Sequence, residues 1–222
     1  MSQEHGRSKA LQDPGAEMVD RLTSLWNRYG RIALGVIGAA VVVGGVAYYT
    51  IQQNRTQDNA ASRKLAEADY LFWQGDYDRA KSTAQEVGKT WGGTPSGIDS
   101  HRIAGDAMYW RGDFKDAVTE YRAYLSHRGS GIAAMAVKRS LAYALDSDKK
   151  FAEAASTYDQ VVGSFDHETS AEMLAASARC LLAASDKAGA IKRYQRIVAE
   201  FGETSYAMQA RVSLGQLGAS AS

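Results

Sequence analysis

A repeated pattern after residue 60 limits the fold more strongly than any other feature of the sequence. Four alanines, each shortly after a turn-forming pair, lie 37, 37 and 36 positions apart; they are Ala80, Ala117, Ala154 and Ala190. Tyrosines four positions after the last three keep the same steps, at Tyr121, Tyr158 and Tyr194. Small residues upstream of the alanines recur with the same spacings of 37, 37 and 36 positions, at Ala68, Gly105, Ala142 and Ala178. A period of this length is typical of solenoids, in which each unit packs only against its neighbours.

Each unit is predicted to be a pair of antiparallel helices joined by a tight turn of Gly-Asp or Asp-Lys. The small residue of the first helix faces the alanine of the second, because only short side chains let two backbones approach closely. An aromatic residue after the turn (Tyr77, Phe114 or Phe151) fills the space between units. The tyrosines lie one helical turn beyond the alanines on the same face. These alanines and tyrosines are therefore the predicted repeat core.

We predict an all-α fold with about four such hairpins and a capping helix over residues 206–217. The longest break between helices is expected at residues 88–100, a turn-rich stretch that contains Trp91. Trp91 is the aromatic residue most available to a partner, and packing onto its own repeats is the alternative. Trp73 and Trp110 precede turns at equivalent positions and are expected in the core.

The pattern resembles the tetratricopeptide repeat over about residues 60–217, with the small–small contact, the turn and the aromatic pair at matching offsets. It differs from that family in its period, since the family's unit has ~34 residues. The fourth unit has Lys187 where an aromatic residue is expected, and the family's early tryptophan and closing proline are absent. The resemblance implies stacked helix hairpins with a concave surface that binds peptides or other proteins.

A second constraint is the run at residues 32–51, which contains 20 residues and no charge. As a helix it spans ~30 Å, the thickness of a bilayer's hydrocarbon core. Aromatic residues suited to the membrane interfaces lie near both ends, at Trp26, Tyr29, Tyr48 and Tyr49. We predict a transmembrane helix over residues 31–52. A signal peptide cleaved near residues 45–47 is the competing interpretation, but the run begins late and follows several acidic residues.

Basic residues flank the run in equal number, but Arg28 and Arg31 together crowd its start more closely than Arg55 crowds its end, which favours a cytoplasmic N-terminus. Small residues four positions apart within the run would let another helix approach closely. They are Gly35, Ala39, Ala40 and Gly44. We therefore consider a helix–helix contact at these four positions.

The segment before the run is predicted to be partly helical. Residues 1–12 are polar and expected to be disordered, and Asp13-Pro14 indicates a helix start. The following apolar residues lie on one helical face, at Met18, Leu22, Leu25, Trp26 and Tyr29. They predict either a short amphipathic helix on the membrane surface or a solvated extension of the membrane helix. The predicted parts are a cytoplasmic segment (1–30), the membrane helix (31–52) and a repeat domain (53–222), whose residues 53–73 continue the membrane helix as a stalk.

Composition and motifs argue against enzyme chemistry. The chain has 26 Lys and Arg against 25 Asp and Glu, so no basic excess indicates nucleic-acid binding. No phosphate-binding or dinucleotide-binding loop occurs, and the four histidines form no i, i+4 zinc pair. The single cysteine, Cys180, is expected to be a small buried hydrophobic residue. We expect no catalytic residue, no cofactor and no metal.

The order of these parts resembles the YfgM-like ancillary subunits of the SecYEG translocon, which have a short cytosolic N-terminus, one membrane helix and a periplasmic tetratricopeptide-like domain. The resemblance implies a single-pass protein of the bacterial inner membrane, whose periplasmic repeats bind chaperones or emerging chains. The main alternative is an accessory structural subunit of another membrane assembly, respiratory, photosynthetic or envelope-spanning. An enzyme, or a regulator of one, is the third hypothesis.

Overall fold

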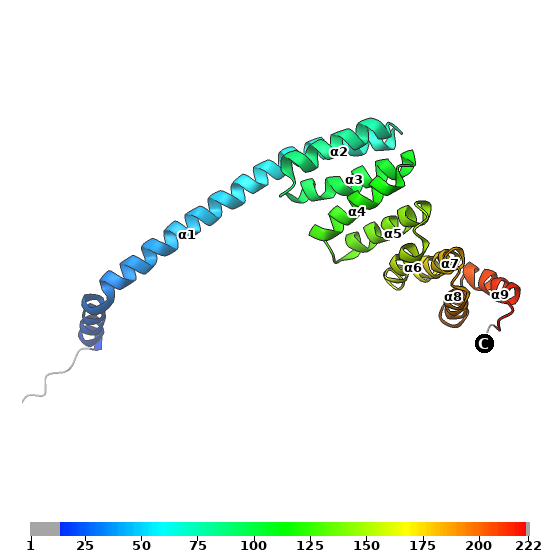
Figure 1. Ribbon diagram of the computed structural model, residues 1–222. Coiled ribbons are helices and arrows are strands. Elements are labelled where there is room, and N and C mark those ends of the chain that lie inside the picture. The colour runs from blue at the N-terminus through cyan, green and yellow to red at the C-terminus, as the bar shows by residue number, and fades with distance from the viewer. Residues whose placement is uncertain (1–13, 221–222) are drawn as a thin grey trace, which may run out of the picture. The chain divides into compact units, whose positions relative to one another are not determined.

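The computed structural model describes residues 14–220, which form nine α-helices and no strand. The helices are α1 (Pro14–Trp73), α2 (Tyr77–Trp91), α3 (Pro95–Arg111), α4 (Phe114–His127), α5 (Ile132–Ser147), α6 (Phe151–Asp159), α7 (His167–Ala183), α8 (Lys187–Glu200) and α9 (Ser205–Gln216) (Figure 1). The predicted all-α fold is confirmed. The chain forms two units, one ending at Asn54 and one beginning at Arg55. The polar residues 1–12 and the predicted cap Asp13 lie outside the described residues.

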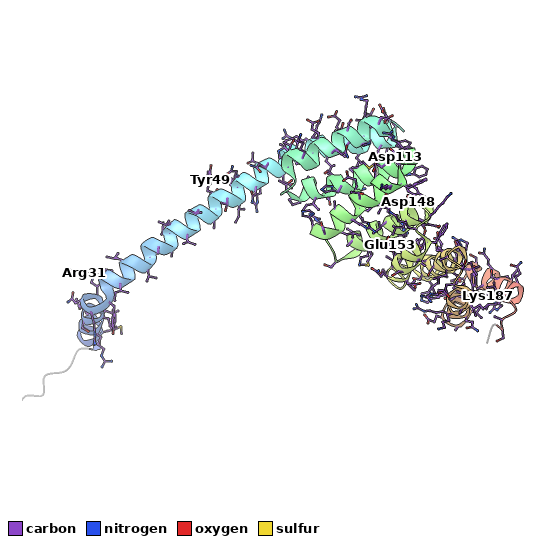
Figure 2. All side chains as sticks on the ribbon, in the orientation of Figure 1. Arg31, Tyr49, Asp113, Asp148, Glu153 and Lys187 are labelled. Atoms are coloured by element: carbon purple, nitrogen blue, oxygen red, sulfur yellow. The ribbon has the colours of Figure 1, made fainter. Side chains whose placement is uncertain are left out.

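The first unit contains the N-terminal part of α1, which is helical without interruption from Pro14. The segment Leu34–Trp73 includes a stretch long and apolar enough to cross a membrane, and none of that stretch is buried inside the protein. Figure 2 shows Arg31 and Tyr49 near the two ends of the uncharged run. The helix has no break at residues 30 or 52, the predicted part boundaries.

Gly30 is the one buried position among the residues of this unit whose burial is described. The indole ring of Trp26 lies over it, and a Cβ on this glycine would come within 3.3 Å of that ring. The missing side chain therefore lets Trp26 lie along the helix surface one turn further on.

The second unit is a solenoid of helix pairs. The end of α1 pairs with α2, and the pairs α3–α4, α5–α6 and α7–α8 follow, with α9 as the final helix. Each helix from α2 onward packs on the next, and α3 also contacts α5, as α7 contacts α9. The first helices of successive pairs therefore share one side of the solenoid. The predicted capping helix agrees with α9 to within one residue at each end.

Both sets of predicted repeat-core residues lie inside the solenoid. The four alanines, Ala80, Ala117, Ala154 and Ala190, are 0% exposed, and Tyr121, Tyr158 and Tyr194 are at most 5% exposed. The largest buried cluster joins residues from α3 to α7, and a second joins α7, α8 and α9. Because each cluster draws on several helices, one hairpin alone leaves an apolar face open.

The four turns within hairpins have the same backbone conformation despite different sequences. Gly75, Gly112, Lys149 and Ser185 all have positive φ, between 60° and 88°. The N–H of each donates to a carbonyl three residues back, and the next N–H donates to one five residues back. This is the Schellman arrangement that ends a helix. The left-handed conformation is easy for glycine but costs other residues ~1–2 kcal/mol.

Polar contacts join the second helices of neighbouring pairs. Gln85 of α2 donates to Glu120 of α4 at 3.0 Å. Arg122 of α4 pairs with Glu153 of α6, and Arg193 of α8 pairs with Asp159 of α6 at 2.5 Å. Figure 2 labels Asp113, Asp148 and Lys187, beside the second, third and fourth turns, which follow one another along this unit.

The long break predicted at residues 88–100 is wrong in extent. Helix α2 continues to Trp91 and α3 begins at Pro95, so only three residues separate the helices. Thr94 caps α3 by accepting a hydrogen bond from the N–H of Gly97 at 3.0 Å. The glycines that suggested a loop instead allow close helix crossing, because a Cβ on Gly97 would lie 1.8 Å from the carbonyl oxygen of Trp91.

The turns generate a prediction about stability. Lys149→Gly should raise the free energy of unfolding by up to ~1 kcal/mol, because it removes left-handed strain. Gly112→Ala should lower it by a similar amount, since open space surrounds the added methyl group and only the backbone conformation is penalised. Urea unfolding of the full-length protein in mild detergent, followed by circular dichroism, measures both.

The control is Gly215→Ala in α9, where the glycine is helical and also open to solvent. This change should raise the free energy of unfolding by ~0.5–1 kcal/mol, through helix propensity alone. A loss of stability in Lys149→Gly would contradict the strain argument.

Candidate protein-binding cleft

A cleft with a volume of about 490 Å³ lies between the end of α1 and α3. The last residues of α1 and the middle and end of α3 supply most of its wall. Tyr77, the first residue of α2, completes it. The lining residues are Asp69, Phe72, Trp73, Tyr77, Arg102, Ile103, Asp106 and Trp110. We call this the aromatic cleft.

The rings of the aromatic cleft contact one another. Tyr77 stacks on Trp110, with ring centroids 6.4 Å apart and an angle of 17° between the planes. Phe72 contacts both Tyr77 and the edge of Trp73, at 5.6 and 5.4 Å. Trp73 is nevertheless 78% exposed and Trp110 62% exposed. The prediction that these two tryptophans lie in the core is therefore wrong.

The exposure of both tryptophans has a structural cause and left a sequence signal. Each occupies the last turn of its helix, where no neighbouring helix covers it. The equivalent positions in the later units hold Ser147 and Ala183, so the repeat does not require an aromatic residue there. Comparison of the units at this position would have marked the tryptophans as local additions to the repeat.

Below the cleft, Gly105 and Tyr121 fix the position of Asp106. A Cβ on Gly105 would lie 2.7 Å from the Tyr121 ring, so the glycine gives that ring its space. The Tyr121 hydroxyl donates to Oδ1 of Asp106 at 2.7 Å. Burial raises the pKa of Tyr121, and the neighbouring Asp106 carboxylate raises it further. The hydroxyl therefore stays protonated and remains a hydrogen-bond donor at physiological pH.

The charged groups of the cleft are two carboxylates and one guanidinium. Arg102 donates from Nη1 to Oδ2 of Asp106 at 3.2 Å. Burial raises the pKa of Asp106, the Asp69 charge also raises it, and the bonds from Tyr121 and Arg102 oppose the increase. Within the described residues, no ion pair or side-chain hydrogen bond involves Asp69. Arg102 thus pairs with Asp106, while the Asp69 carboxylate lines the cleft without an ion pair.

The residues predicted from sequence for partner contact or membrane contact lie elsewhere. Trp91 ends α2, is partly exposed and does not line the aromatic cleft. The proposed interfacial residues and the small residues of the span are exposed on α1: Trp26, Tyr29, Tyr48, Tyr49, Gly35, Ala39, Ala40 and Gly44. The cleft residues Phe72, Trp73, Tyr77 and Trp110 were not predicted as a site.

Groups that often carry chemistry have structural partners. Cys180 is 1% exposed, and burial raises the pKa of its thiol to about 12, so a reactive thiolate is disfavoured. His101 and His127, expected to be isolated, have stacked rings 6.3 Å apart, and His101 Nδ1 lies 2.7 Å from Glu120. Across residues 14–220, no group of three His, Cys, Asp or Glu side chains is arranged to hold a metal ion.

The fold and the cleft together define a class, the helix-hairpin solenoids that act as interaction scaffolds. The profile of the "Tetratricopeptide repeat-like domain" family matches residues 23–173, which is more than half of the chain. The protein therefore belongs to the tetratricopeptide repeat-like domain family. The matched region includes the apolar part of α1 as well as the first hairpins.

Solved structures share the fold. A Podosopora anserina protein described as a putative kinesin light chain with nearly identical TPR-like repeats superimposes with a TM-score of 0.56. The sequences are 17% identical, over 70% of this chain and 84% of that chain. A point variant of that protein gives the same TM-score and identity, over 86% of its length. No curated protein matches the sequence.

The packing below the cleft generates a prediction. Gly105→Ala should lower the free energy of unfolding by ~1–3 kcal/mol, because the added methyl group overlaps the buried Tyr121 ring. In a Tyr121→Leu background the same change should cost clearly less, since the ring is gone. Equal costs in the two backgrounds would show that the Gly105–Tyr121 contact is not the cause. Thermal unfolding of the wild-type protein, the two single variants and the double variant, all full-length, measures the four stabilities of this double-mutant cycle.

Proposed function

We propose that the protein is a non-enzymatic, membrane-anchored interaction module whose repeat domain binds partner proteins beside a membrane complex. The observation that carries the proposal is the continuity of α1, which contains the apolar segment and also forms the first helix of the solenoid. The family profile spans both parts, which supports treating them as one functional arrangement. Anchoring the repeats by one helix raises their local concentration near other membrane proteins.

The proposed compartment is the periplasm, with the N-terminus in the cytoplasm of a bacterium. Two arginines, Arg28 and Arg31, lie within four residues of the start of the uncharged run, against one, Arg55, at its end, and this supports the orientation. The layout shared with YfgM-like translocon subunits supports a role beside the protein-conducting channel. Chaperones or emerging chains would be the partners, and the aromatic cleft is the surface we assign to them.

The second candidate function is a structural subunit of another membrane assembly. Its specific support is two exposed pairs of small residues on α1, Gly35 with Ala39 and Ala40 with Gly44. A Cβ on Gly35 or Gly44 would contact nothing within 4 Å, so backbone at these positions is open to close approach by another helix. In this case Gly35 with Ala39 and Ala40 with Gly44 would each offer a close-contact surface, on opposite sides of the helix.

Site-specific crosslinking separates the two functions. A photoreactive amino acid at Trp110 should crosslink periplasmic chaperones or translocating chains in intact membranes. The same group at Thr119, exposed on α4 and not part of the cleft, is the matched control and should give few such products. Crosslinks from Gly35 or Gly44 to one stoichiometric membrane partner, with none from Trp110, would favour the structural subunit instead.

Cysteine labelling tests the orientation. In a Cys180→Ala background, Asn59→Cys should react with a membrane-impermeant maleimide in spheroplasts, whereas Ser24→Cys should react only after detergent is added. Both positions are exposed, so accessibility depends on the membrane side and not on folding. Labelling of Ser24→Cys alone in intact spheroplasts would reverse the proposed topology.

A further inference from the structure

The aromatic cleft combines open ring faces with a carboxylate that has no partner among the described residues. Trp73 and Trp110 expose most of their surface, and Tyr77 supports Trp110 from one side by stacking. Large exposed aromatic residues that line a concave site commonly mark a binding surface. The negative faces of such rings attract cations, most strongly for tryptophan.

The charges of the cleft favour a cation over an anion. Asp69 and Asp106 face the same cavity as Arg102, and the three formal charges sum to a negative value. Arg102 already pairs with Asp106 through Nη1 at 3.2 Å, so the Asp106 carboxylate offsets its charge. Asp69 has no ion pair in the described part of the chain. An incoming cation would therefore form an ion pair with Asp69, while the net negative charge would repel an incoming anion.

The neighbouring carboxylates give a second reason. Burial raises the pKa of Asp106 and the Asp69 charge adds to this effect, so the cleft already stabilises positive charge or an added proton. A bound ammonium or guanidinium group would relieve the repulsion between the two carboxylates. The volume of about 490 Å³ lies within the usual range for a ligand site and is ample for one long side chain.

We infer that the aromatic cleft binds a lysine or arginine side chain of an extended segment in the partner protein. The aliphatic stem of that side chain lies against the exposed rings, and its charged head contacts Trp110 and Asp69. This inference rests on the proposed function and names the chemistry that its surface recognises. It predicts that partners present basic residues beside flexible or unfolded segments.

The test uses the full-length protein in neutral detergent and a fluorescent peptide that alternates lysine with serine. The reference peptide has every lysine acetylated, which keeps the stem but removes the charge. The lysine peptide should bind at least ~10-fold more tightly, as loss of cation–π and carboxylate contacts together implies. Fluorescence anisotropy measures both affinities at low salt and again at physiological salt.

Two variants locate the binding site. Trp110→Leu and Asp69→Asn should each weaken binding of the lysine peptide ~3–10-fold. Trp91→Phe and Asp116→Asn are the matched controls, since they change an aromatic residue and an exposed carboxylate outside the cleft, and should leave affinity unchanged. Circular dichroism confirms that each variant is folded.

The inference is overturned if acetylated and unmodified peptides bind equally, if neither binds at millimolar concentration, or if a glutamate–serine peptide binds better. It is also overturned if the control variants weaken binding as much as the cleft variants do. Failure here with retained crosslinks from Trp110 in membranes would remove the cationic ligand and leave the interaction module intact. Loss of the membrane crosslinks with retained peptide binding would instead contradict the interaction module and leave the cationic ligand of the cleft intact.

Discussion

Burial of apolar faces between consecutive hairpins is the constraint on which the rest of this structure depends. One pair of helices cannot cover its own apolar residues, so each unit needs the next. Comparison of the backbone strain in the turns with the gain from apolar burial shows that burial dominates. Lys149 and Ser185 hold left-handed conformations at ~1–2 kcal/mol each. Fully burying one large apolar side chain stabilises the folded state by ~1.5–3 kcal/mol. Leu145 and Leu174, both 0% exposed, lie in the clusters that these two turns help to form.

The sequence predicted the hairpins well because its repeated alanines mark the points where two backbones meet, and this contact allows few alternatives in residue size. It predicted the aromatic cleft poorly. Trp110 lies seven positions after buried Ile103, so helical periodicity alone directs it towards the core. Whether the last turn of a helix is covered depends on the lengths of its neighbours, which periodicity does not specify. The same limit explains the break expected at residues 88–100, where glycines serve helix crossing instead of a loop.

The two sets of helices differ in what they contribute to the cleft, although polar contacts also join first helices, as between Tyr143 of α5 and Glu172 of α7. The second helices of neighbouring pairs are tied by polar contacts such as Arg193 to Asp159, which fix the spacing of the units. The first helices of the first two hairpins carry the charges and most of the rings of the cleft, and Tyr77 of α2 supplies the remaining ring. Because Ser147 and Ala183 occupy the equivalent later positions, the cleft is an addition to the repeat, and removing its tryptophans need not disturb the stacking.

The weak recognition and the membrane anchoring that we propose for this chain suit each other. A single cation–π contact at an exposed site contributes only ~0.5–1 kcal/mol, too little to select a partner from dilute solution. Restriction to a membrane supplies effective concentrations in the millimolar range, at which such contacts matter. Under the proposed function, α1 links the membrane anchor to the cleft wall, so a partner bound in the cleft is retained at the membrane. Cutting α1 between these parts should therefore weaken partner capture far more than it weakens peptide binding.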